Sequence, residues 1–205
     1  MGQEKLGLRG LSGAGQRRER LFVTGPSIGQ GSSYDYYTAK HSGTNGSVIW
    51  EKRYTGAGEN NDFPRGLAVD FAGDVVVTGE TAYFGGVDIY TVRYSGANGA
   101  VLWSQQTPGE GEGVTVDSAG NAYVVGQEAL SPVRELYTVK YASATGSILW
   151  EKNSTLWTSF SSSYQQLGGV AVDPSNGANI PDAANCSRCM KHWTTSARAT
   201  RRRPS

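Results

Sequence analysis

The amino-acid sequence repeats one pattern with a period of about 50 residues, and this repeat constrains the fold more than any other feature. Two aliphatic residues precede each of three tryptophans, Trp50, Trp103 and Trp150, which follow one another at intervals of 53 and 47 residues. A second motif keeps step with them, as GLAVDFAGDVVVTG at 66–79 and GVTVDSAGNAYVVG at 113–126. A repeat of this length indicates a small supersecondary unit that stacks on copies of itself.

A third motif alternates with a period of two residues, which is typical of β-strands. It occurs at 36–41, 90–94 and 137–141, each time shortly before the tryptophan. In its second copy, YTVRY, the two tyrosines and the valine fall on one face, and the threonine and arginine on the other. In the run VIWEK at 48–52 we likewise expect Val48 and Trp50 to share a buried face.

Each repeat divides into four strand-like runs separated by turn residues. In the second repeat we expect strands at 67–69, 75–78, 89–94 and 100–104. The connecting segments place aspartate first and glycine near the end, where a turn needs a positive φ. The residues that we assign to these turns are Asp70, Gly73, Asp117 and Gly120.

Four-stranded units of about 50 residues predict β-propeller blades, in which neighbouring sheets cover each other's faces. The fold class expected is therefore all-β, with incomplete propeller blades of four antiparallel strands, about three to four in number. We expect Trp50, Trp103 and Trp150 to fill the gaps between adjacent blades, because a large apolar ring suits that position.

The repeat domain is expected at 21–178, with units at about 21–65, 66–112 and 113–168 and a partial unit at 169–178. Residues 1–20 and 179–205 lack strand periodicity, and we expect them to be irregular. Residues 1–20 carry a net charge of +3 and residues 186–205 a net charge of +6, whereas 21–185 carry −8. Because propellers close with 4–8 blades, we interpret the chain as a fragment of a longer protein whose ends come from a mispredicted reading frame.

With these motifs in view, residues 21–177 resemble bacterial SBBP-type β-propeller repeat proteins. The matching elements are a D-x-Y-T-V-[KR]-Y run, an [ST]-G-x-x-x-x-W run and a G-x-x-V-D-x-x-G-[ND]-x-x-V-x-G run. The resemblance implies a bacterial protein of the cell envelope or the extracellular space. It also implies that the repeats serve as binding or structural modules, without a general catalytic site.

Two neighbouring families share parts of the pattern. TGSILW at 145–150 is similar to the tryptophan-docking motif of quinoprotein-type propellers, some of which bind pyrroloquinoline quinone. VDSAGNAYV at 116–124 is similar to the core of an NHL-type blade. Because non-enzymatic propellers share the tryptophan motif, we interpret it as a packing device and expect no cofactor.

No catalytic residue is predicted from the side chains of the repeat domain. His41 is the only histidine in that domain and aligns with Tyr94 and Tyr141, so we expect it to pack at the end of a strand. Glu110 and Glu112 could act as a carboxylate pair only at a defined separation across a cleft. In the run PGEGEG we expect them to lie on a solvated loop.

No metal site is predicted either. Asp70, Asp117 and Asp173 recur after the first strand of each unit, and they could form a ring of calcium ligands or cap their own turns. Neither the loop that follows Asp70 nor the loop that follows Asp117 has the spacing of a compact calcium site, which favours aspartates that cap their own turns. Cys186 and Cys189 form one C-x-x-C pair with only His192 nearby, whereas a structural zinc site needs four ligands.

The charge and hydropathy patterns exclude two classes of partner. The run of arginines at 201–203 has no interleaved aromatic residues, so we expect no nucleic-acid binding. No apolar run is long enough to span a bilayer, and residues 1–20 contain no signal peptide. The sequon at 153–155 matters only in a glycosylating secretory pathway.

The function predicted is that of a non-enzymatic repeat module that presents loops to an unidentified protein or carbohydrate partner. The alternative is a fragment of a propeller enzyme, such as a quinoprotein-like dehydrogenase or a lyase, which would gather titratable residues near the propeller axis. A third interpretation is that the isolated chain has no function because it cannot close. An open arc leaves blade faces uncovered, so we also expect self-association.

Overall fold

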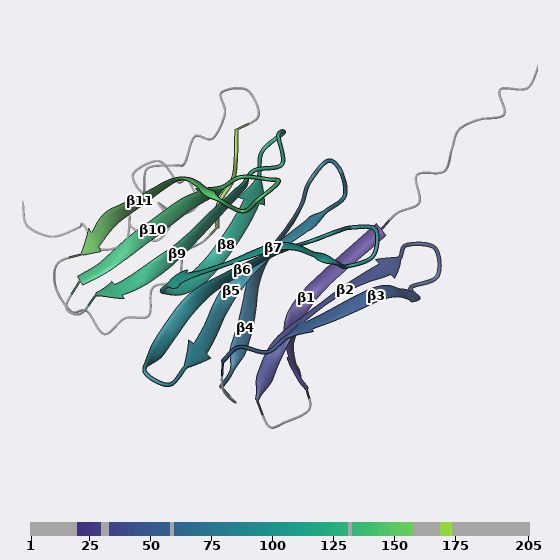
Figure 1. Cartoon of the computed structure of the whole chain (residues 1–205), viewed down its shortest axis with the longest axis horizontal. Helices are drawn as coiled ribbons and strands as arrows, with labels where there is room; N and C mark the ends of the chain where they lie inside the picture. Colours follow the sequence, from purple (N-terminus) through teal and green to yellow (C-terminus); the bar gives the residue numbers. More distant parts are fainter. Residues whose placement is uncertain (1–19, 30–32, 58–59, 131–132, 158–168, 174–205) are drawn as a thin grey trace, which may run out of the picture.

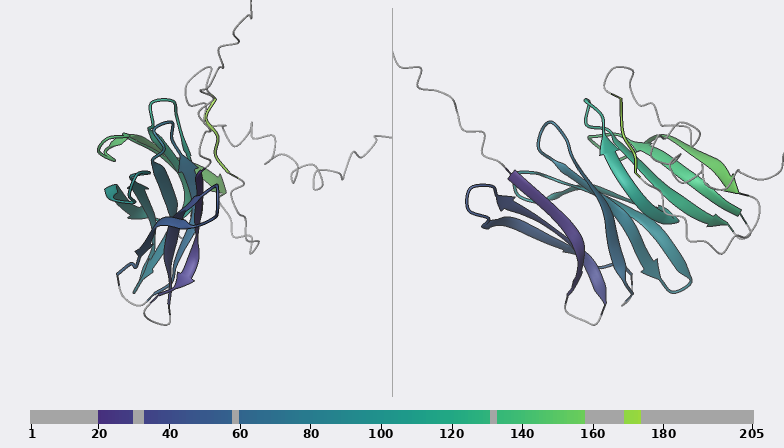
Figure 2. Two further views of the ribbon diagram at one scale, coloured as in Figure 1. Left: turned by 90° about the vertical axis from the view of Figure 1, so that its right-hand side faces the viewer. Right: turned by 180° about the vertical axis from the view of Figure 1, so that it is seen from behind.

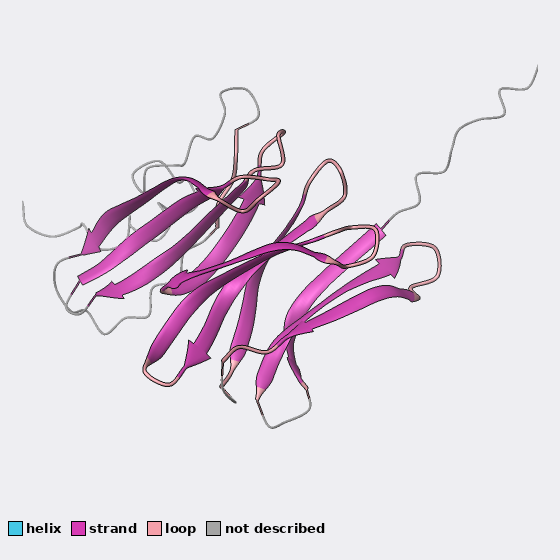
Figure 3. Ribbon diagram, viewed as in Figure 1, coloured by secondary structure: helices cyan, strands magenta, loops and turns pink. Residues whose placement is uncertain are grey.

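The computed structural model describes residues 20–29, 33–57, 60–130, 133–157 and 169–173, and these residues form an all-β fold (Figures 1 and 3). They contain eleven strands and no helix, which confirms the predicted fold class. The predictions for 1–19 and 179–205 lie outside the described residues. The strands are β1 (Arg20–Ile28), β2 (Tyr34–Ser42), β3 (Val48–Tyr54), β4 (Asp62–Val69), β5 (Val75–Tyr83), β6 (Gly86–Tyr94), β7 (Val101–Pro108), β8 (Glu110–Val116), β9 (Ala122–Leu130), β10 (Val133–Tyr141) and β11 (Ile148–Trp157).

The strands form three antiparallel sheets in which each strand pairs with its neighbour in the sequence. The first sheet is β1-β2-β3, the second is β4-β5-β6-β7 and the third is β8-β9-β10-β11. The three sheets lie side by side in chain order (Figures 1 and 2). This is the arrangement of consecutive propeller blades, and the sheets are called blades 1, 2 and 3 below.

The observed strands are longer than the sequence predicts. In blade 2 the run expected at 67–69 belongs to a strand that begins at Asp62, and the run expected at 75–78 continues to Tyr83. The added residues pair across the blade: Asp62 lies opposite Thr81 and Phe63 opposite Glu80. The sequence pattern finds only the apolar half of each strand, because the other half carries polar residues that also pair.

The expectation that Val48 shares a buried face with Trp50 is wrong. Trp50 is buried, whereas Val48 is 51% exposed and Ile49 is 50% exposed. The register explains the difference, because Lys40 pairs with Trp50 but His41 pairs with Val48, which leaves Ile49 as the extra residue of a β-bulge. The same shift precedes Trp103 and Trp150, so each blade exposes one pair of aliphatic residues beside its tryptophan.

Buried side chains fill the spaces between adjacent blades. One apolar cluster joins blades 1 and 2 and includes Tyr36, Trp50, Val75, Val77, Tyr90, Val92 and Tyr94. A second joins blades 2 and 3 and includes Val76, Ile89, Trp103, Ala122, Val124, Tyr137, Val139 and Tyr141. Strand β6 of blade 2 therefore lies between two layers, which is why both faces of YTVRY at 90–94 are buried.

The first strands of successive blades approach each other through glycine. A Cβ atom at Gly66 of β4 would lie 3.1 Å from Gly113 Cα of β8, which is a tight contact, so glycine eases this approach. A Cβ atom at Gly113 would in turn lie 3.6 Å from Val170 Cγ1. The segment 169–173, which carries the sequence GVAVD, therefore lies beside β8, where a further first strand would stand, and forms a β-bridge at Asp173 (Figure 1).

Candidate functional site

The tryptophan of one blade docks on a glycine turn of the next blade. Trp103, at the end of blade 2, is 6% exposed, and its Nε1 donates a hydrogen bond of 2.9 Å to Ser143 O of blade 3. A Cβ atom at Gly146 would lie 2.7 Å from Trp103 Cδ2, and Gly146 has a φ of 69°. The turn between β10 and β11 therefore forms a flat platform on which the indole lies.

The same contact joins blades 1 and 2. Trp50 is 7% exposed, and its Nε1 donates to Gly96 O at 3.4 Å. A Cβ atom at Gly99, whose φ is 71°, would lie 2.8 Å from Trp50 Cδ2. The indole also contacts Tyr94 of blade 2, with ring centroids 6.1 Å apart.

Trp150 and Gly46 are the corresponding residues at the two ends of the arc. Trp150 is only partly buried and contacts Tyr123 of its own blade, with ring centroids 5.9 Å apart. Gly46 has the same backbone geometry as the two occupied platforms, with a φ of 72°. A Cβ atom at Gly46 would meet no atom within 4 Å.

A buried ion pair adds a polar link between blades 2 and 3. Arg93 on β6 pairs with Asp70, and the two side chains are 4% and 3% exposed. Its other terminal nitrogen, Nη1, donates a hydrogen bond of 2.8 Å to Gly120 O of blade 3. Asp74 Oδ2 lies 3.2 Å from Arg93 Nη2. The guanidinium thus holds a turn of its own blade against a turn of the next.

The predicted turn residues lie where the chain reverses direction. Asp70 Oδ1 accepts a hydrogen bond from Asp74 N at 2.9 Å, and Asp117 Oδ1 accepts one from Asn121 N at 2.9 Å. Gly73 has a φ of 89° and Gly120 a φ of 79°. The second oxygen of each aspartate binds a cation on the third strand of the same blade, which is a role that the sequence analysis missed.

Blade 3 repeats this ion pair with lysine in place of arginine. Lys140 Nζ lies 3.1 Å from Asp117 Oδ2. Burial alone would raise the pKa of Asp117, but hydrogen bonds from Asn121 and Lys140 outweigh it and hold that pKa below its ordinary value. Burial alone would lower the pKa of Lys140, but hydrogen bonds with Tyr123 and Asp117 raise it.

Blade 1 has the cation of this site without a carboxylate among the residues that the structure describes. Lys40 is 4% exposed, binds Gly96 O of blade 2 and lies over the ring of Phe22. Arg20 stands where blade 2 has Asp74. Burial, with a smaller contribution from the charge of Arg20, lowers the pKa of Lys40.

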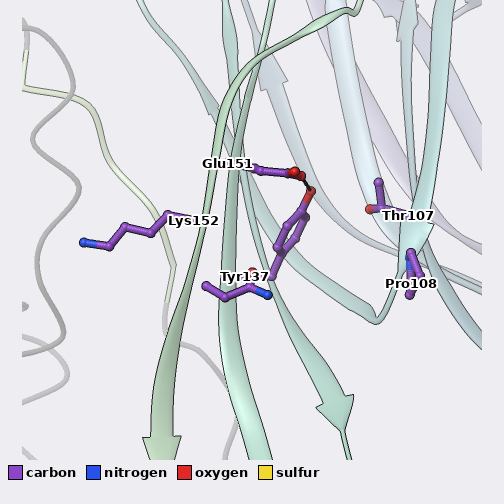
Figure 4. Close-up of a pocket in the computed structure, with 6 residues that line it drawn as sticks. Thr107, Pro108, Tyr137, Glu151 and Lys152 are labelled. Carbon is purple, nitrogen blue, oxygen red and sulfur yellow. Dashed lines mark hydrogen bonds between the residues drawn. The ribbon is translucent and has the colours of Figure 1, made fainter.

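The described residues have a surface hollow between blades 2 and 3 of about 310 Å³ (Figure 4). Tyr137 points into it and donates a hydrogen bond of 2.7 Å to Glu151 Oε2. Burial, and then this hydrogen bond, raises the pKa of Tyr137. The lining residues are Thr107, Pro108, Tyr137, Glu151, Lys152 and Asn153.

The hollow has a simple origin in the repeat. Between blades 1 and 2 the corresponding space is filled by Tyr54, which stacks on Tyr90 with ring centroids 3.6 Å apart and planes at 6°. Thr107 occupies the position of Tyr54 in blade 2, and Tyr137 that of Tyr90 in blade 3. The hollow therefore lies where an aromatic ring fills the first interface.

The structure also places the remaining candidates from the sequence. His41 is the last residue but one of β2, with its Nδ1 3.0 Å from Gly46 O. Glu110 and Glu112 lie on strand β8, so the expectation of a loop is wrong: the run PGEGEG continues directly into the first strand of blade 3. Asp173 ends the segment 169–173. Cys186, Cys189, His192 and residues 201–203 lie outside the described residues.

One group of charges, which the sequence analysis missed, lies at the first strands. Arg65 on β4 forms an ion pair of 2.8 Å with Glu80 on β5. Burial alone would lower the pKa of Arg65, but Glu80, and more weakly Glu112 and Glu110, raise it. The repeat could not reveal this group, because its charges do not recur: Arg65 aligns with Glu112, and Glu80 aligns with Gln127. No cluster of three or more histidine, cysteine or acidic residues suited to a metal occurs in the described part of the chain.

One comparison with known proteins, a match to a protein-family model, supports the architecture. Residues 52–82 match a family model described as SBBP, beta-propeller repeat, so the chain carries a repeat of this type. Among solved structures, BamB from Moraxella catarrhalis is similar at 12% identity and a TM-score of 0.30, over 62% of this chain. The chain spans 44% of that structure's length. The search of curated proteins found no match. The described residues contain no helix long and apolar enough to cross a membrane.

Proposed function

We propose that the chain is a non-enzymatic β-propeller repeat module of a bacterial extracellular or cell-envelope protein. The observation that carries this proposal is the use of the repeat-aligned polar and aromatic residues. Arg93, Lys140 and Trp103 are all engaged in joining turns and blades. Residues that recur in every blade thus maintain the scaffold, and binding is left to positions that differ between blades.

The positions that differ include two fully exposed aromatic rings in blade 2. Phe71 is 102% exposed in the turn between β4 and β5, and Phe84 is 100% exposed in the turn between β5 and β6. Phe84 follows Tyr83, which is 41% exposed. Adjacent exposed rings offer a flat apolar face to a sugar ring or to a partner protein. We assign the binding surface to the turn that carries Tyr83 and Phe84, with a carbohydrate as ligand.

Retention of the chain on insoluble polysaccharides tests this assignment. Cellulose, chitin and peptidoglycan serve as probes, and retention on at least one of them is expected. Phe84→Ser should abolish retention, whereas Phe71→Ser, at the opposite end of β5, should leave it unchanged. Equal retention of both variants, or no retention of the unmodified chain, would reject a carbohydrate-binding turn.

The location of the protein needs a separate measurement. We expect the protein in intact bacteria to be accessible to added protease, because the proposed location is outside the cytoplasmic membrane. A cytoplasmic protein of the same cells serves as the control and should stay intact. Protection of both proteins would reject the extracellular and cell-envelope location.

The alternative of a propeller-enzyme fragment rests on the charges around Arg65. Glu80 binds Arg65, and Glu110 and Glu112 contribute to the same field. Such a group could orient a charged substrate at the first strands. If it does so, Arg65→Gln should remove substrate turnover in a screen of dehydrogenase and lyase substrates while leaving the fold unchanged. Absence of turnover in that screen supports the non-enzymatic module.

A further inference from the structure

Among the described residues, blade 1 has no counterpart of the first strand that blades 2 and 3 possess. Its strand β1 corresponds to β5 and β9, so Gly25 aligns with Gly79 and Gly126. A Cβ atom at Gly79 would collide with Phe63 O of β4, and one at Gly126 would lie 2.5 Å from Glu110 O of β8. At Gly25 a Cβ atom would meet nothing within 4 Å. The edge of β1 is therefore open to another strand.

The segment 169–173 has the sequence of a first strand and forms a single β-bridge, at Asp173. Its sequence, GVAVD, matches GLAVD at 66–70 and GVTVD at 113–117. It lies beside β8, as β8 lies beside β4, at the end of the row of blades far from β1 (Figures 1 and 2). The described residues thus form a three-stranded blade at one end of the row. At the other end they form an additional segment with the sequence of a first strand.

The tryptophan contacts show the same complementarity. Two docking pairs, Trp50 with Gly99 and Trp103 with Gly146, are formed within the chain. Trp150 lies on the last strand of blade 3, and its indole is only partly buried. The Gly46 platform of blade 1 is uncovered. The two ends of the arc therefore carry the two halves of a third docking pair.

The charged residues at the two ends of the arc are complementary in the same way as the strands and the tryptophans. The third-strand cation of blade 2, Arg93, and that of blade 3, Lys140, each bind the aspartate that follows the first strand of their blade. In blade 1 the corresponding cation, Lys40, is buried without a carboxylate among the described residues. Asp173 stands at the matching position, at the end of the segment 169–173.

We propose that two copies of this chain join head to tail and close a six-bladed propeller. The segment 169–173 of each copy adds to β1 of the other and completes its blade 1. By analogy with blades 2 and 3, Val172 then lies opposite Leu21, Ala171 opposite Phe22 and Val170 opposite Val23. Six blades fall within the range in which propellers close, and closure leaves no uncovered blade face.

The assembly places each incomplete group beside its complement. Trp150 of one copy lies on the Gly46 platform of the other, as Trp103 lies on Gly146. Leu136 meets Gly25, as Ile89 meets Gly126. Asp173 reaches Lys40, as Asp117 reaches Lys140. Asp173 has an interaction within its own chain, so this last contact exchanges one interaction for another.

Light scattering after size-exclusion chromatography of the full chain tests the proposal. The expected mass is twice the 21.9 kDa of one copy. Gly25→Val should give the mass of a single copy. The new side chain has open space in one copy, because Gly25 is not among the glycines with positive φ, but it would collide with the added strand.

A second variant removes the indole of Trp150 and leaves both the segment 169–173 and strand β1 unchanged. Trp150→Ser should weaken the dimer at least tenfold, and Leu149→Ser, which changes a neighbouring side chain that is 52% exposed, should leave the mass unchanged. Far-UV circular dichroism checks that all variants keep their β signal. A single-copy mass for the unmodified chain would overturn the proposal. The open edge of β1 would then be left for the repeats of another protein to cover. A ladder of larger polymers, or a dimer that persists in both variants, would also overturn the proposal.

Discussion

Tyr54 and Tyr90 lie face to face across the first interface between blades, with ring centroids 3.6 Å apart and planes at 6°. The second interface has Thr107 and Tyr137 at the same positions and a hollow of about 310 Å³ beside them. The two interfaces are thus built on one plan, but several side chains differ: Tyr36, Phe22 and Tyr54 of the first interface stand where the second has Ile89, Val76 and Thr107. The exchange of Tyr54 for Thr107 removes a stacked ring. This difference allows the contribution of an interface residue to be measured within a single chain.

Thr107→Tyr should fill the hollow and stabilise the protein by about 1 kcal/mol, because a new aromatic pair forms with Tyr137. The reverse change in the first interface, Tyr54→Thr, should cost about 3 kcal/mol, since it leaves a cavity where the ring was. The midpoint of urea unfolding measures both effects. Equal midpoints for the two variants would show that the rings do not couple the blades.

Gly146→Ala should destabilise the chain by about 3 kcal/mol. A side chain at a φ of 69° costs about 1 kcal/mol, and the contact with Trp103 adds the cost of overpacking. Gly46→Ala is the matched control, because its φ is 72° but its surroundings are open. It should cost only about 1 kcal/mol. Both are made in the Gly25→Val chain, so that assembly does not contribute, and similar losses would contradict a specific role of the indole contact.

Asp70→Asn should cost about 3 kcal/mol at neutral pH, because it keeps the capped turn but leaves the buried Arg93 guanidinium without its principal carboxylate. Asp74→Asn should cost less than about 1 kcal/mol, since the Asp74 side chain is 24% exposed. Thermal unfolding followed by circular dichroism distinguishes the two variants. A larger loss for Asp74→Asn would reverse the assignment of the principal partner.

Acid should weaken the third blade through Asp117. Its pKa is lower in the folded chain than the ordinary value of 3.8, so the ionised carboxylate contributes stability above that value. This contribution is lost as the pH falls from about 4 toward the lower pKa of the folded state. Asp117→Asn should therefore lower stability at pH 7 and flatten its dependence on pH below about 4. An unchanged slope in that range would exclude Asp117 as a source of acid sensitivity.

The sequence predicts the blades well because every blade has to form the same contacts. Trp50, Trp103 and Trp150 and the turn glycines recur, so their spacing reveals the unit even though no two copies are identical. Period two fails at Ile49 because a β-bulge adds one residue to the strand. A rule based on alternation alone cannot detect that insertion.

The ion pair between Asp70 and Arg93 could not be predicted from single strands. Asp70 was assigned to its own turn, and one of its oxygens does cap that turn, but the other oxygen pairs with Arg93. A signal was present in the sequence: a cation recurs at 40, 93 and 140 on strands that are otherwise apolar or aromatic. A buried cation needs a counter-charge, and the recurring aspartates were the available carboxylates.

The docking of each tryptophan on the next blade sets an order for folding during synthesis. The acceptor of the Trp50 indole lies 46 residues later in the chain, and that of Trp103 lies 40 residues later. At about 5–20 residues per second, a ribosome reaches each acceptor roughly 2–9 seconds after the indole has been made. Every blade therefore leaves the ribosome with one aromatic side chain uncovered, and the newest blade is always the one most exposed to chaperones and proteases.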